Sequence, residues 1–244
     1  MKQVRAVFRR EMLAYATTPT AYVFVAVLVA ALGMFTFQAG RFFELGRADL
    51  SAFFAFHPWL FMIFMPAIAM RLWAEEARSG ALETLLTLPM PTWALVAGKF
   101  LAAWAVAALA LALTFPLWIT VNILGHPDNA AIAAGYFVSL LMAGGYLAIG
   151  SAMSAVSASQ VVALVLAVAV AFVFTAAGTP LVLNFVNGWA GAQTASMIAD
   201  LSALNHFEGA ARGVVEIRSL FYFLTLIAMF LSFTALAVEA RREG

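Results

Sequence analysis

Residues 71–99 read RLWAEEARSGALETLLTLPMPTWALVAGK, and the rest of the chain is arranged around this stretch. The chain has 13 Lys and Arg and 12 Asp and Glu residues, and six of these charged residues fall here: Arg71, Glu75, Glu76, Arg78, Glu83 and Lys99. Long apolar blocks lie on both sides. An ionised side chain in hydrocarbon costs about 2.5–3.5 kcal/mol, so the stretch is expected to leave the membrane between two spans.

The middle of this stretch has the composition of a helix. Residues 74–88 contain no Pro and a single Gly, and they are rich in Ala, Leu and Glu. Pro89 and Pro91 are expected to end the helix. Three leucines fall on one face, with Arg78 and Glu83 towards another. The sequence therefore predicts a short amphipathic helix over residues 74–89, at the membrane surface and open to water.

The composition predicts an all-α integral membrane protein. Of the 244 residues, 65% are hydrophobic and 10% are charged, whereas soluble domains have roughly 45–50% and about 25%. The net charge of +1 and the lack of a basic cluster with stacking aromatics argue against nucleic acid as a partner. The chain has no cysteine, which excludes disulfides and thiolate metal sites.

Six membrane spans are predicted, over residues 20–37, 57–73, 93–122, 131–156, 161–185 and 220–238. Lys99 is expected to extend back to the headgroups, and Pro116 is expected to kink the third span. Residues 187–216 form an outer loop that should hold one or two short re-entrant or amphipathic helices.

Residues 2–16 predict an interfacial amphipathic helix whose basic face meets anionic membrane lipid. Glu11 does not fit this pattern, because it lies among the basic residues. A signal peptide is the other interpretation, but the apolar block begins too late for one. Nine Lys and Arg residues lie in the two termini and the 71–99 stretch, against four on the other side. The positive-inside rule therefore places both termini and this stretch in the cytoplasm.

The fourth predicted span contains small residues at four-residue spacing. Gly144 and Ala148 form one row, and Gly150 and Ser154 form another. Such rows let helix backbones approach closely, so this span is expected to pack against another helix.

Several kinds of chemistry are not supported. No Asp, Glu, Lys or Arg lies in residues 100–127 or 129–199, whereas ion-coupled carriers place ionisable residues near the midplane. Gly98 and Lys99 resemble the end of a phosphate-binding loop. However, Trp93 and Phe100 replace the Gly and the Ser or Thr that the loop requires, so this chain is not expected to hydrolyse ATP.

No metal or cofactor site is expected. None of His57, His126 and His206 has a partner at metal-ligand spacing. A six-span protein with a cytoplasmic amphipathic helix and no energy source suits the membrane half of a transporter that a separate subunit drives.

The 71–99 stretch resembles the E-E-x-x-x-G-x-x-E-x-L-L-x-x-P…G-K motif of ABC type-2 permeases, with Ala81 where the family more often has Thr. The resemblance implies that two permease chains pair, as a homodimer or heterodimer, and dock on cytoplasmic ATPase subunits that bind ATP and Mg²⁺. It further implies that this stretch forms the ATPase-coupling surface, with Glu75, Glu76, Arg78, Gly80, Glu83, Thr84, Leu86, Pro89 and Lys99 as its residues.

A second motif precedes the last span and comprises His206, Phe207, Glu208, Arg212, Gly213, Glu216 and Arg218. It is similar to the branch of the family that includes the gliding-motility permease GldF, with the nitrous-oxide-reductase maturation permease NosY more distant. This resemblance implies an extracytoplasmic auxiliary protein as a further partner.

The sequence thus predicts the non-catalytic permease subunit of an ABC exporter in the bacterial inner membrane. The main alternative is a membrane anchor or scaffold that binds an ATPase without moving a substrate, and a secondary carrier is the third. Substrate-stimulated ATPase activity in vesicles would separate the first two, and uptake driven by an ion gradient would favour the third.

Overall fold

The computed structural model describes residues 2–44, 46–87 and 90–243, apart from the side chains of Thr84, Leu86 and Glu243, and this part of the chain contains helices and no strand. The helices are α1 (Lys2–Thr17), α2 (Pro19–Met34), a π-helical turn η1 (Phe35–Ala39), α3 (Ser51–Ala55), α4 (His57–Ala69), α5 (Arg71–Ser79), α6 (Ala81–Leu86), α7 (Thr92–Ala112), α8 (Phe115–Leu124), α9 (Asn129–Val156), α10 (Gln160–Ala176), α11 (Pro180–Ala190), α12 (Ala192–Asp200), α13 (Ala203–Ala211) and α14 (Ile217–Glu243).

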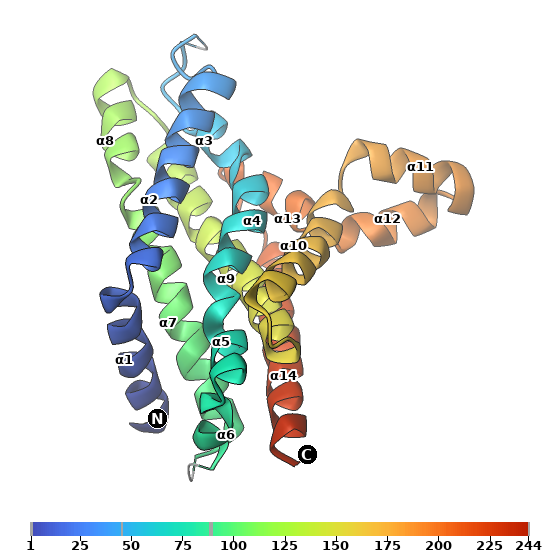
Figure 1. Ribbon diagram of the computed structural model, residues 1–244. Coiled ribbons are helices and arrows are strands. Elements are labelled where there is room, and N and C mark those ends of the chain that lie inside the picture. Colours follow the sequence, from blue (N-terminus) through green and yellow to red (C-terminus); the bar gives the residue numbers. More distant parts are fainter. Residues whose placement is uncertain (1, 45, 88–89, 244) are drawn as a thin grey trace.

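Helix α9 is the centre of the bundle, and α4, α7, α10 and α14 pack around it (Figure 1). Residues 141–152 of α9 are all buried. A Cβ atom at Gly150 would lie 2.6 Å from the Cβ of Ala69 in α4, and one at Gly144 would lie 2.9 Å from the Cδ1 of Ile227 in α14. The two glycines therefore allow close approach of two different neighbours, α4 at Gly150 and α14 at Gly144. Ala148 is fully buried in the same segment.

Four segments are long and apolar enough to cross a membrane: Pro19–Ala39, Thr92–Leu124, Asn129–Val156 and Ile217–Arg242. The number rises to five if α10 and α11, which meet at 72°, form one span. The chain is therefore a multi-pass membrane protein. Helix α4, in the second predicted span, has 13 residues and is not among these segments.

Two breaks change the predicted course of the chain. The helix of the fifth predicted span, residues 161–185, is not continuous, because α10 ends at Ala176 and Pro180 begins α11 at 72° to it. A Cβ atom at Gly178, between them, would overlap Ser202 Oγ. In the third predicted span, the helix breaks at residues 113–114, and Pro116 lies in the first turn of α8, a position that needs no N–H donor.

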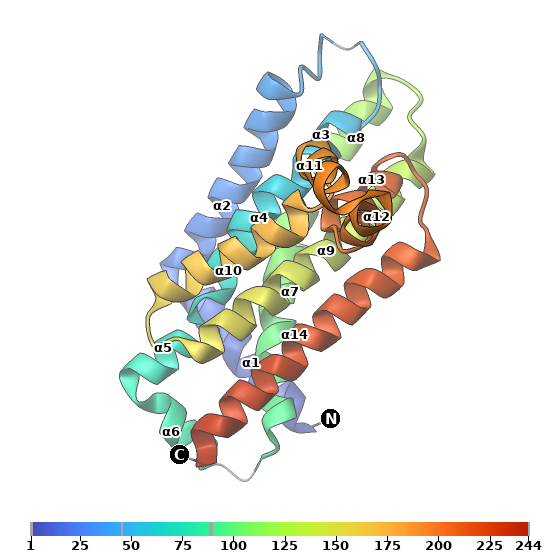
Figure 2. The same cartoon turned by 90° about the vertical axis from the view of Figure 1, so that its right-hand side faces the viewer.

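The two ends of the bundle differ in character. Helices α1, α5 and α6 and the C-terminus gather at one end, and α3 and α8 lie at the other (Figure 2). The hairpin of α11 and α12 projects sideways from the bundle, towards the end that carries α3 and α8 (Figure 1). The predicted outer loop, residues 187–216, thus comprises the end of α11 together with α12 and α13.

Candidate coupling surface and its charge cluster

The predicted amphipathic helix over residues 74–89 is two helices, α5 and α6, so the prediction of one continuous helix is wrong. Gly80 joins them with φ +71° and ψ −1°, in the left-handed region. Residues that carry a side chain rarely adopt this backbone conformation, whereas glycine adopts it without a steric cost. We call the α5–α6 pair the elbow. Pro89, a predicted member of the coupling surface, lies outside the described residues, as do the side chains of Thr84 and Leu86.

The elbow presents charge on its outer side and leucines on its inner side. Arg78 and Glu83 are exposed, and neither forms an ion pair with any residue that the structure describes. Leu82 and Leu85 are buried in the apolar core. Glu75 is half exposed and accepts a hydrogen bond from Arg71 at 2.8 Å, one helical turn away. Arg78 and Glu83 are therefore free to meet a partner in water.

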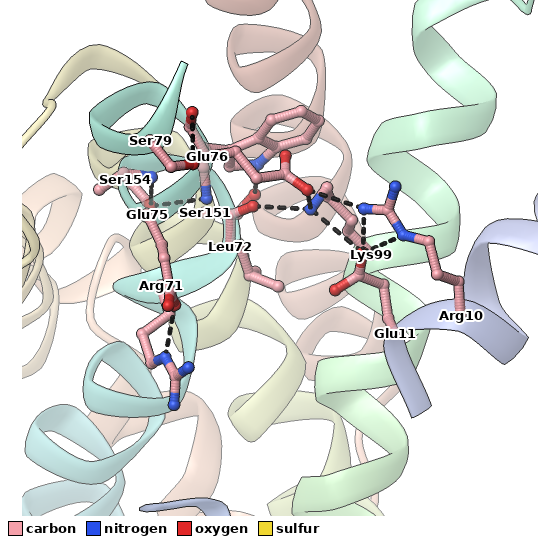
Figure 3. A network of polar contacts seen from close by, with 12 residues as sticks. Arg10, Glu11, Arg71, Leu72, Glu75, Glu76, Ser79, Lys99, Ser151 and Ser154 are labelled. Carbon is pink, nitrogen blue, oxygen red and sulfur yellow. Dashed lines mark hydrogen bonds and ion pairs between the residues drawn. The ribbon is translucent and has the colours of Figure 1, made fainter. Parts of the chain in front are cut away.

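Lys99 lies inside the bundle behind the elbow, with only 2% of its side chain exposed (Figure 3). Its Nζ donates to Glu76 Oε1 at 2.8 Å, to the Leu72 carbonyl oxygen at 2.8 Å and to Glu11 Oε1 at 3.3 Å. The prediction that Lys99 extends to the headgroups is therefore wrong. The ammonium group points inward because two carboxylates and a carbonyl replace the water that it has lost.

Arg10 completes this group of ionised side chains. Its guanidinium donates to Glu11 Oε1 at 2.6 Å and to Glu76 Oε1 at 2.7 Å. Burial lowers the pKa of Arg10, but hydrogen bonds and the charges of Glu11 and Glu76 outweigh this, so the pKa is raised above its usual value. We call Arg10, Glu11, Glu76 and Lys99 the charge cluster. It is formally neutral, and it joins α1, α5 and α7 at one point.

A cavity of about 320 Å³ opens beside the charge cluster between α1, α5 and α7. Its wall includes the whole charge cluster together with Tyr15, Arg71 and Glu75. Glu76 Oε2 is buried and has no hydrogen-bond partner among the described atoms, whereas Glu76 Oε1 accepts from both Arg10 and Lys99. All the ion pairing of Glu76 thus runs through one oxygen.

Two serines of α9 fix the start of α5. Ser154 Oγ accepts hydrogen bonds from the backbone N–H groups of Trp73 (3.1 Å) and Ala74 (3.0 Å), and it donates to the Met70 carbonyl at 2.8 Å. The hydroxyl is inserted into the backbone hydrogen bonds at the junction of α4 and α5, which is a recognised cause of helix breaks. Trp73 is fully buried, and its indole donates to Ser151 Oγ at 3.0 Å. Movement of the elbow is thereby linked to α9 as well as to α1 and α7.

Sequence reasoning missed Glu11, Arg10, Trp73 and Ser151 as members of this site. Glu11 gave a signal, because it was the one acid on the basic face of the N-terminal helix. It faces Lys99, 88 residues further along the chain. Gly98 allows this contact, since a Cβ atom there would lie 2.6 Å from the Cβ of Val7, at the point where α1 and α7 pack together.

The second motif lies at the other end of the bundle, around α13. His206 is buried, its Nδ1 lies 3.3 Å from Ser219 Oγ, and its Nε2 lies 3.0 Å from the Asp200 carbonyl oxygen. Phe207 is buried as well, and Arg218 pairs with Asp200 at 2.6 Å. The structure thus uses part of this motif to hold α12, α13 and α14 together.

The remaining members of the second motif face outward or form a turn. Glu208, Arg212 and Glu216 are exposed, and none of them forms an ion pair within the described part of the chain. Gly213 has φ +87°, and a Cβ atom there would lie 2.7 Å from the Cβ of Ala131 at the start of α9. Of the other two histidines, His57 is fully buried, with its Nδ1 2.7 Å from Ser139 Oγ, and His126 is exposed.

Comparison with known proteins adds one finding to this geometry. The family model described as ABC-2 family transporter protein matches residues 60–238, from α4 to near the end of α14. No curated protein matches the chain.

Proposed function

Because the chain belongs to the ABC-2 family of transporter proteins, whose members are membrane permease subunits of ABC transporters, we propose that it works as an exporter driven by a separate cytoplasmic ATPase. Two permease chains would form the translocation path. ATP and Mg²⁺ would bind the ATPase subunit, and this chain would bind neither.

The observation that carries the proposal is the elbow, with exposed charge on one side and a rigid attachment on the other. Arg78 and Glu83 have no partner within the described chain and suit a docking surface of mixed charge. Behind them, Glu76 pairs with Lys99 and Arg10, so a displacement of the elbow would move α7 and α1 directly. The hydrogen bonds of Ser154 would transmit the same displacement to α9, the central helix.

The membrane arrangement that we propose has six spans. Helix α4 with the start of α5 would be the second span, α10 the fifth, and the four long apolar segments the others. Both termini and the elbow lie at one end of the bundle, which we place in the cytoplasm of a bacterial cell, with the chain in the inner membrane (Figure 2).

We also propose that the chain belongs to the gliding-motility-like branch and binds an extracytoplasmic auxiliary protein. The support is the motif around α13, where Glu208, Arg212 and Glu216 are exposed at the end opposite the elbow.

The test is purification of the tagged chain from its native membrane in mild detergent, with the ATPase activity of the eluate as the readout. Arg78→Glu and Glu83→Lys should each lower the activity about tenfold or more. Like charges facing each other across an interface cost several kcal/mol, and each 1.4 kcal/mol is tenfold. Arg47→Glu is the matched control, because it reverses an exposed charge in the loop before α3, at the opposite end of the bundle, and should leave the ATPase activity unchanged.

Full ATPase activity in both elbow variants would contradict the proposed coupling surface. The ATPase could also co-elute and yet hydrolyse ATP in vesicles at the same rate with and without this chain. In that case the chain is an anchor for the ATPase and not its permease.

A further inference from the structure

A long apolar groove of about 710 Å³ lies between α1, α7 and α9, on the side of α1 away from the elbow. Phe8 of α1, Leu101 and Trp104 of α7 and Leu140 of α9 form much of its wall. The indole of Trp104 donates to the Leu140 carbonyl at 2.8 Å, so its N–H is satisfied and its ring can serve as an apolar surface. The groove therefore suits a hydrocarbon chain.

One end of the groove is basic. Arg5 is the only charged residue among the described residues of its wall, and Trp93, more than half exposed, lies at the same end. Within the part of the chain that the structure describes, Lys2, Arg5 and Arg9 form no ion pair, whereas Arg10, on the same helix, is held in the charge cluster. Three exposed cations of α1 are thus available for an anion at this end.

The length of the groove matches one leaflet of a bilayer. From Trp93 to Ala108 along α7 is about 22 Å at the helical rise of 1.5 Å per residue. Half of a bilayer is about 20–22 Å thick when its headgroup region is included. A smaller apolar hollow of about 290 Å³ shares Ala108 and Leu140 with the groove and extends it towards α8. A phospholipid would place its headgroup by Arg5 and Trp93 and its acyl chain along α7.

We propose that this groove is a binding site for a single anionic phospholipid, with Arg5 on its phosphate and Lys2 and Arg9 adding positive charge nearby. The charge of the basic end decides between lipid classes, because a zwitterionic lipid of the same chain length would fill the groove but gain less from the three cations. The bound lipid would hold α1 against α7 from the side opposite the charge cluster (Figure 1). The proposal rests on the membrane placement of the chain and not on the proposed ATPase partner.

The test is native mass spectrometry of the purified full chain in detergent, titrated with phosphatidylglycerol or with phosphatidylcholine of the same acyl chains. The wild type should bind one phosphatidylglycerol at least fivefold more tightly than phosphatidylcholine. Arg5→Gln should remove most of this preference, since one basic residue near anionic lipid contributes about 1 kcal/mol, or roughly fivefold. Arg242→Gln removes an exposed cation of α14 and is the matched control.

A second variant tests the groove itself. Ala105→Phe puts a ring into the groove and should weaken the binding of both lipids, whereas Ala228→Phe adds the same ring to an exposed position of α14 and should weaken neither. Equal affinity of the wild type for the two lipids would overturn the proposal. Full retention of phosphatidylglycerol by both Arg5→Gln and Ala105→Phe would also overturn it. The measurement needs no ATPase, so its outcome is independent of the coupling experiment.

Discussion

Replacing Lys99 with Met should destabilise the protein more than any other single change in the charge cluster. The side chain is 2% exposed, and its removal takes one cation from Glu76 and Glu11, whose side chains are 18% and 12% exposed. Removing one partner of a buried ion pair costs about 3–5 kcal/mol, because the other partner stays buried and charged. Arg10 still pairs with both carboxylates, so we expect the lower end, about 3 kcal/mol.

The assay is thermal unfolding in detergent, followed by tryptophan fluorescence. For a chain of this size, 1 kcal/mol shifts the Tm by about 2–4 °C, so Lys99→Met should lower it by about 6–12 °C. Lys2→Met is the matched control, since Lys2 is exposed and forms no ion pair with the described residues. It should leave the Tm within about 2 °C of the wild type.

Neutralising one of the two carboxylates should restore stability. Adding Glu76→Gln to Lys99→Met removes the uncompensated negative charge and leaves Arg10 paired with Glu11, so the charge cluster is formally neutral again. The double variant should therefore regain at least half of the lost Tm. If Lys99→Met unfolds at the wild-type temperature, or if the added Glu76→Gln lowers the Tm further, the charge cluster does not hold the three helices together as we infer.

Further predictions concern the backbone contacts around the same site. Gly98→Ala should cost about 1–3 kcal/mol in thermal unfolding, because the new methyl group meets Val7; Gly33→Ala, with nothing within 4 Å, should be neutral or stabilising. Ser154→Ala should cost about 1–3 kcal/mol in the same assay, since it leaves buried backbone groups without their hydroxyl partner. Gly80→Ala should cost about 1–2 kcal/mol and lower the co-eluting ATPase activity, because an L side chain opposes the left-handed bend of the elbow; unchanged activity would show that the bend is not needed.

The sequence allowed the helical class and four of the six predicted membrane-crossing segments to be found, since both depend on long apolar runs and on local helix propensity. The helix of residues 131–156 is observed as α9, and the basic N-terminal helix as α1. These elements follow from periodicity and composition alone, and they require no knowledge of which helix lies beside which.

The breaks and the charge cluster could not be predicted in the same way, because each depends on contacts between distant residues. The hydroxyl of Ser154 meets Met70 across 84 positions of sequence. Lys99 was expected at the headgroups because its inward partners, Glu11 and Glu76, come from two other helices. Gly80 was visible in the sequence, but an isolated Gly is tolerated within a helix, so its left-handed conformation was not evident.

The distance in sequence between Glu11 and Lys99 also sets an order of events during synthesis. Helix α1 leaves the ribosome before α7, and its partner Lys99 follows Glu11 by 88 residues. Synthesis proceeds at about 5–20 residues per second, so roughly 4–18 s pass between the synthesis of Glu11 and that of Lys99. A helix with one apolar face and a row of cations can spend that interval on the membrane surface. The interfacial state that its sequence predicts would then be a stage in assembly, which ends when Lys99 arrives and neutralises Glu11.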